Sequence, residues 1–378
     1  MIKKIIAVTV AICLVSGVTA YAGTPEFART EEEWNRLRDN VLEYDEIDDL
    51  IKEFNVSVKS NSQSLKEYKA EKGSTNDSLR QFYSDMAAEL RADADYSSAA
   101  TSLSAVMNES AASSYEQLAD SALDDYETER LGYEMAEKTL AMNAKSMMIS
   151  YYSAQLDAEK AGLNTDLMKS QLDVANVQSK TGTATDVDVL SATESLMNAQ
   201  KEKTTAEMNV NTTQKKLQVM CGWRYADTPV FGGLPEPDFE RIAVIDPDAD
   251  IQTAIDNNYT LRINRRKLAN ASSDSAKDST QLAIDSNITN ISISLDSAYS
   301  ALMSAKLVYD YAVLASNVQQ RLLSIAEKKH ELGDMSDVEF KSQQAASRTA
   351  GIAAQQAEYS LLQALMTYDY NVAGIASA

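Results

Sequence analysis

Proline placement constrains the fold of this 378-residue chain more than any other feature. The five prolines are Pro25, Pro229, Pro235, Pro237 and Pro247. None lies between residues 26 and 228, and none follows 247. A proline in a helix interior costs about 3 kcal/mol. Two long proline-free stretches rich in Ala, Leu, Gln, Lys, Glu and Met therefore predict an almost entirely α-helical protein, in which the Pro/Gly-rich segment 222–247 is a linker.

The first 22 residues have the pattern of a secretory signal peptide. Two lysines precede an apolar run over residues 5–18, and Ala20-Tyr21-Ala22 supplies a small-residue cleavage site. The run is shorter than the ~20 residues that a membrane-spanning helix needs. An N-terminal membrane anchor is the alternative. We expect an exported protein of the cell envelope whose mature chain begins near Gly23.

Composition argues against several classes of function. The net charge of −21 disfavours nucleic acid and anionic lipid as partners, because both attract clusters of Lys and Arg. Cys221 is the only cysteine beyond the signal peptide, so no intramolecular disulfide can form. No residue set has the spacing of a metal site, a phosphate loop or a catalytic triad, so we predict no cofactor and no enzyme activity. His330, the only histidine, is expected to be an exposed residue near a helix C-terminus rather than a metal ligand.

A seam of period 3.5 runs along the helical stretches. Its members, spaced alternately four and three apart, include Leu140, Ala144, Met147, Tyr151 and Ala154, then Val189, Ala192, Leu196 and Ala199, and finally Leu295, Ala298, Leu302, Ala305 and Tyr309. Such spacing keeps one stripe against a neighbouring helix and favours a left-handed supercoil. The many alanines leave a thin seam that buries little area, so chains of this kind are often completed by oligomerisation. An ordinary helical bundle is the alternative.

The two halves of the chain are related to each other. A passage around Gly182 matches one around Gly333 at an offset of 151 residues, and the Asn55 passage matches the Asn258 passage at an offset of 203. We therefore predict two helical repeats, residues 23–221 and 248–378. An unbroken helix from 114 to 180 in the first repeat would be about 100 Å long. Gly132 and Gly162 are the candidate positions for a bend or break.

Each glycine passage has the chemistry of a tight turn between two helices. Gly182 and Gly333 suit the left-handed position that ends a helix. Thr185 or Asp186, and Ser336 or Asp337, are good N-caps for the next helix. Each half is then a long helix, a tip and a returning helix, which is a helical hairpin.

The tips, together with the acidic helices that open each half near Tyr44–Ile51 and Asp248–Leu261, resemble the TolC-type outer-membrane efflux family. The first tip keeps Gly182, Thr185, Asp188, Val189 and Leu190 of the family's turn, and the second keeps Leu332, Gly333, Ser336 and Val338. The resemblance covers about residues 44–223 and 248–374, in the family's order. It implies an all-α protomer of two tandem hairpins in a trimeric tube of twelve helical strands.

The resemblance also implies partners and sites. The tips would contact a periplasmic adaptor protein that works with an inner-membrane pump. The implied contact residues are Gly182, Thr185 and Asp186 in the first tip and Leu332, Gly333, Ser336 and Asp337 in the second. The implied pore constriction comprises Asp188, Glu339 and Ser342. Serine at 342 departs from the acidic residue that the family has there.

One further departure concerns strands. Family members insert a strand pair in each half, which would fall near residues 60–115 and 275–295. Neither region alternates convincingly, and Asn287–Ser294 is the best strand candidate. We therefore expect a TolC-like body with a reduced or missing membrane barrel. This expectation leaves open a second function, a structural or adaptor coiled-coil protein of the envelope without a lumen.

Overall fold

The computed structural model describes residues 28–94, 97 and 99–375. The predicted signal peptide lies outside the described residues. The helices of the N-terminal part are α1 (Glu31–Arg38), α2 (Ile47–Phe54), α3 (Val56–Lys72), α4 (Asn76–Ala92), α5 (Ala99–Asp120), α6 (Tyr126–Lys180) and α7 (Asp186–Met220), with the short helix η2 at Tyr44–Glu46. The C-terminal part holds α8 (Phe239–Val244), α9 (Pro247–Asn257), α10 (Tyr259–Asn270), α11 (Asp274–Glu331), α12 (Asp337–Tyr370) and η3 (Asn371–Ile375). Two short strands, β1 (Val41–Leu42) and β2 (Val230–Phe231), pair in parallel.

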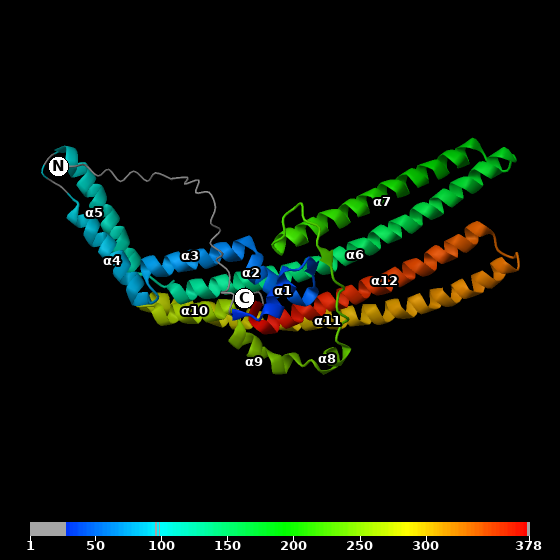
Figure 1. Ribbon diagram of the computed structural model, residues 1–378. Coiled ribbons are helices and arrows are strands. Elements are labelled where there is room, and N and C mark those ends of the chain that lie inside the picture. The colour runs from blue at the N-terminus through cyan, green and yellow to red at the C-terminus, as the bar shows by residue number, and fades with distance from the viewer. Residues whose placement is uncertain (1–27, 95–96, 98, 376–378) are drawn as a thin grey trace.

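Two long helical hairpins dominate the molecule, as predicted. Helix α6 packs along α7, and α11 packs along α12. Both hairpins extend in the same direction and end in turns at the same end of the molecule (Figure 1). The shorter helices surround the bases of the hairpins, and the α4–α5 hairpin projects from the opposite end. The all-α prediction with two tandem hairpins is therefore confirmed for the described residues.

The alanine-rich seam packs the hairpins. Ala144 and Ala154 of α6, Ala199 of α7, and Leu295 and Leu302 of α11 are all buried. Alanine adds little volume, so helices can pack closely where it lies in the seam. Other faces of the hairpins expose large apolar side chains, such as Met197 and Leu314.

The structure decides three local points that the sequence left open. Helix α6 begins at Tyr126 rather than running through from 114, and it passes through Gly132 and Gly162 without a break. The helix continues through both glycines because each costs only about 1 kcal/mol of helix stability. It begins at Tyr126 because the Asp125 carboxylate accepts hydrogen bonds from the N–H groups of Glu127 and Thr128. The strand candidate 287–294 lies inside α11, because Ile288 and Ile291 continue the helical seam to the buried Leu295.

Equivalent close contacts close the base of each half. Gly222, just after α7, lies against Phe54, and Gly374, just after α12, lies against Asn257. The Asn55 side chain donates to the Met220 carbonyl at 2.7 Å, and Asn257 donates to the Val372 carbonyl at 3.0 Å. Phe54 and Asn257 correspond at the offset of 203 residues, so the close approach of a glycine to this position recurs in both halves. The donating asparagines, Asn55 and Asn257, do not occupy equivalent positions. The division at 23–221, 222–247 and 248–378 stays a prediction, and the linker segment itself contains β2 and α8.

A polar joint attaches the α4–α5 hairpin to the body. Asp125 is fully buried, and its Oδ2 accepts a 2.8 Å hydrogen bond from Arg266 Nε of α10. Burial raises the pKa of the Asp125 carboxyl, but Arg266 and the Thr128 N–H together outweigh it, so the pKa lies below its ordinary value. The Asn270 side chain donates to the Leu123 carbonyl at 2.8 Å beside it.

This joint gives a pH-dependent prediction. Because the folded pKa of Asp125 is lowered, its stabilisation is complete above the unfolded pKa of about 3.9 and is lost as the pH falls through the folded value. We expect Asp125→Asn to lower the free energy of unfolding by about 2 kcal/mol at pH 7. The difference from the native chain should shrink toward pH 3. Chemical denaturation across this range measures it, and a difference that is constant with pH would contradict the assignment.

Candidate functional site at the helical tips

The first tip joins α6 to α7. Gly182 has φ +76°, the left-handed conformation predicted for it. The N–H groups of Thr183 and Ala184 bond back to the Gln178 carbonyl at 2.9 and 3.2 Å, which satisfies the helix end. Thr185 is the N-cap of α7, and its hydroxyl and backbone N–H both contact the Asp188 carboxylate in a capping box.

The second tip repeats this geometry between α11 and α12. Gly333 has φ +79°, and the Asp334 N–H bonds to the Lys329 carbonyl at 2.8 Å. Ser336 is the N-cap of α12 and forms a capping box with Glu339. Predicted tip residues from both halves thus occupy matching positions, although the adaptor contact and pore roles assigned to them stay predictions.

His330 differs from its expected role. Its side chain is half-buried, its Nε2 lies 2.7 Å from Asp337 Oδ1, and its ring stacks on Phe340 with centroids 4.5 Å apart. The bond to His330 lowers the pKa of the Asp337 carboxyl. The histidine therefore connects α11 to α12 across the tip. Among the described residues, no group of three or more His, Cys, Asp or Glu side chains could hold a metal ion.

The predicted constriction residues are all exposed at or near the tips. Backbone and side-chain bonds from Thr185 lower the pKa of Asp188, and bonds from Ser336 lower that of Glu339. Both carboxylates are therefore anionic at neutral pH, and both already stabilise their own helix N-terminus. Ser342 lies one turn further along α12 and lines a groove of about 870 Å³ between the two hairpins.

Polar contacts link the two hairpins along α6 and α12. Arg348 Nη2 of α12 lies 2.7 Å from Glu159 Oε2 of α6, and this bond lowers the pKa of the Glu159 carboxyl. Lys341 Nζ donates to Ser170 Oγ at 3.1 Å, nearer the tips. Beyond these contacts the hairpins diverge (Figure 1). The sequence carried no signal for these pairs, because neither helix reveals which face meets the other.

A second apolar stripe on α11 is the main feature that sequence reasoning missed. Its members are large, exposed and spaced at helical intervals: Leu307, Tyr311, Leu314, Val318, Leu322 and Ile325. Helix α7 also exposes large apolar side chains, namely Val187, Leu190, Met197 and Met208. The helical spacing of the α11 stripe is present in the sequence, as a second apolar pattern next to the seam that packs against α12. Within the described residues, no helix has the length and apolar character needed to cross a membrane.

Comparison with solved structures decides the fold. A membrane protein from Pseudomonas aeruginosa aligns with a TM-score of 0.57 at 14% identity, over 87% of this chain and 93% of that one. The Campylobacter jejuni CmeC outer membrane channel aligns with a TM-score of 0.56 at 12% identity, over 94% of this chain and 92% of that one. The outer-membrane channel OprN aligns with a TM-score of 0.56 at 13% identity, over 95% of this chain and 96% of that one. This chain has a TolC-like fold. No protein-family model and no curated protein matches the sequence, so the likeness is one of fold.

The TolC-like fold accounts for the placement of the tips. In this chain the two turns lie at the same end of two hairpins that extend in the same direction (Figure 1), and each turn has a left-handed glycine and a capping box. The fold alone assigns no transported solute, partner or membrane.

Proposed function

We propose that this chain is one protomer of a trimeric, TolC-like tunnel of the cell envelope, which serves efflux or secretion and has no enzyme activity. The observation that carries the proposal is the pair of exposed apolar stripes on α7 and α11. Neither stripe is covered in the single chain, and both run along the hairpins that would form the wall of a tube. Association of copies side by side would bury them.

The tips are the proposed contact with a periplasmic adaptor and its inner-membrane pump. Each tip presents exposed apolar side chains beside anionic groups. Leu332 accompanies Asp337 in the second tip, and Val187 accompanies Asp186 in the first. An apolar centre with charged neighbours is typical of a protein contact surface. Passage through the tube would be passive, and the tips would narrow it.

Cross-linking tests whether the tips converge on one axis. We expect Asp186→Cys and Asp337→Cys, introduced together, to give linked trimers with a short bifunctional maleimide, because six thiols would surround one opening. The native chain is the control: Cys221 is buried, which raises the pKa of its thiol to about 12, and it should stay unlinked. Absence of linked species in the double variant would count against the tunnel, and a stable monomer would favour the structural coiled-coil protein.

The Arg348–Glu159 pair gives a second test, of tip movement. We expect Arg348→Ala to broaden the distance distribution between spin labels at Asp186→Cys and Asp337→Cys within one protomer, because it removes a link between the hairpins. Labelled chains are diluted with unlabelled ones so that distances within a protomer dominate. The cost in stability should stay below about 1 kcal/mol, as both groups are partly exposed.

Lys306→Ala is the matched control for this test. It removes the Lys306–Asp310 pair, which is also exposed but lies within α11 alone. Its distance distribution should equal that of the labelled double-cysteine chain without a further substitution. Equal distributions for that chain and for its Arg348→Ala version would show that the pair does not hold the tips together.

A further inference from the structure

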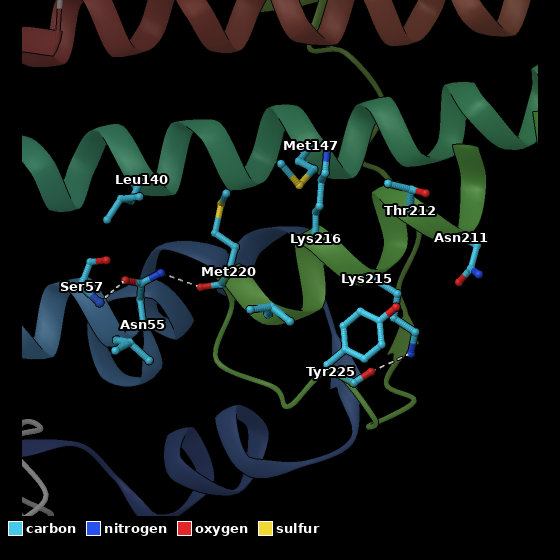
Figure 2. A pocket seen from close by; sticks show the side chains of 12 residues that line it. Asn55, Ser57, Leu140, Met147, Asn211, Thr212, Lys215, Lys216, Met220 and Tyr225 are labelled. Atoms are coloured by element: carbon cyan, nitrogen blue, oxygen red, sulfur yellow. Dashed lines mark hydrogen bonds between the residues drawn. The ribbon is translucent and has the colours of Figure 1, made fainter. Parts of the chain in front are cut away.

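A cavity of about 730 Å³ lies at the base of the first hairpin, where α7 ends beside α6 and the start of α3 (Figure 2). Its apolar wall is formed by Leu140 and Met147 of α6 and by Val219 and Met220 of α7. Val56 at the start of α3 also lines it and is 77% exposed. The volume falls within the range of about 300–1,000 Å³ that is usual for small-molecule sites.

The charges around this cavity have one sign. Lys215 and Lys216 line it, and no Asp or Glu does, although the chain as a whole carries a net charge of −21. Lys215 is held in place, since its Nζ donates to the carbonyls of Tyr225 and Asp227 at 3.0 and 3.2 Å. It contributes positive potential without being free to move.

Lys216 is the available cation. Figure 2 shows its side chain extending from α7 toward Met147 of α6, across the cavity. Within the part of the chain that the structure describes, its ammonium group has no hydrogen bond or ion pair. A flexible ammonium above an apolar wall provides the two contacts that an amphipathic anion needs, a counter-charge for the head and a dry surface for the tail.

We propose that this cavity binds a single-chain amphipathic carboxylate, with its alkyl tail on Leu140, Met147 and Val219 and its carboxylate on Lys216. Two ammonium groups favour the anion over a cationic amphiphile of the same length. One unpaired lysine matches one negative charge. The site is remote from the tips. Val219 lies on the same face of α7 as Met208, so the proposal requires this end of the face to stay open in an assembly of copies.

Calorimetric titration of the mature chain with dodecanoate tests the proposal, with dodecyltrimethylammonium as the matched cation. Dodecanoate should bind once per chain, and the cation should bind at least tenfold more weakly. Absence of dodecanoate binding, as when a neighbouring copy fills the cavity, overturns the proposal. Equal affinity for the two amphiphiles also overturns it.

Two charge variants at one position provide the sharpest control. Val56→Lys and Val56→Glu remove the same apolar contact from an exposed site, so neither should prevent folding, but they add opposite charges. The lysine variant should bind dodecanoate about tenfold more tightly than the glutamate variant. Equal affinities would show that charge does not select the ligand.

Lys216→Gln then assigns the head group. It should weaken dodecanoate binding about fivefold. Lys201→Gln, which changes the same charge on an exposed part of α7 outside this cavity, should leave the affinity unchanged. Equal losses in the two variants would overturn the role of Lys216.

Discussion

Gly222→Ala should destabilise the protein by about 4 kcal/mol, because the added Cβ would strain the backbone at Gly222 and would also clash with Phe54. Gly222 has φ +100°, where a residue with a Cβ is strained by about 1–2 kcal/mol. That Cβ would also lie 2.3 Å from Phe54 Cβ and 3.1 Å from the Phe54 carbonyl carbon and oxygen, so backbone must move. Chemical denaturation followed by far-UV circular dichroism measures the loss.

Two other glycines separate these costs. Gly182 also has a positive φ, but its Cβ would meet nothing within 4 Å, so Gly182→Ala should cost only about 1–2 kcal/mol. Gly132 lies inside α6 with open space around it, so Gly132→Ala should stabilise by about 0.5–1 kcal/mol. If Gly222→Ala costs no more than Gly182→Ala, the close contact between α2 and the end of α7 does not exist.

If copies form the proposed trimer, the paired variant Leu314→Glu and Val318→Glu should convert it into monomers. These side chains are 63% and 56% exposed in the single chain, so the fold of one protomer should survive. In the assembly, however, the variant would place two carboxylates per copy in an apolar contact, which is costly unless they are paired. Size-exclusion chromatography with light scattering measures the mass, and circular dichroism checks that the helices remain.

Gln320→Glu is the control for this variant, because it adds an acid to another exposed face of α11. It should leave the mass of a trimer unchanged. A paired variant that also keeps the trimer mass would show that the α11 stripe is not the contact between copies.

Most of the hairpin architecture was readable from the sequence, because its signals are local. Absence of proline predicts helix, a period of 3.5 predicts a packed stripe, and glycine followed by Thr or Ser three residues later predicts a tip. At both tips the structure has this turn, with Gly182 and Gly333 in the left-handed conformation and Thr185 and Ser336 as N-caps.

The remaining features depend on contacts between distant segments. Asp125 caps α6 locally, but its buried carboxylate also pairs with Arg266, 141 residues away, and the sequence does not reveal this partner. His330 pairs with Asp337 only because the turn brings α11 and α12 together. The isoleucines of 287–294 fit both a strand and a helix, and the packing of Ile288 and Ile291 in one cluster with Leu295 favours the helix.

Electron microscopy of the purified mature chain tests the tunnel most directly. Three copies that bury their α7 and α11 stripes should give end-on views with threefold symmetry around a central bore and side views of an elongated particle. Monomers, or compact particles without a bore, would contradict the account.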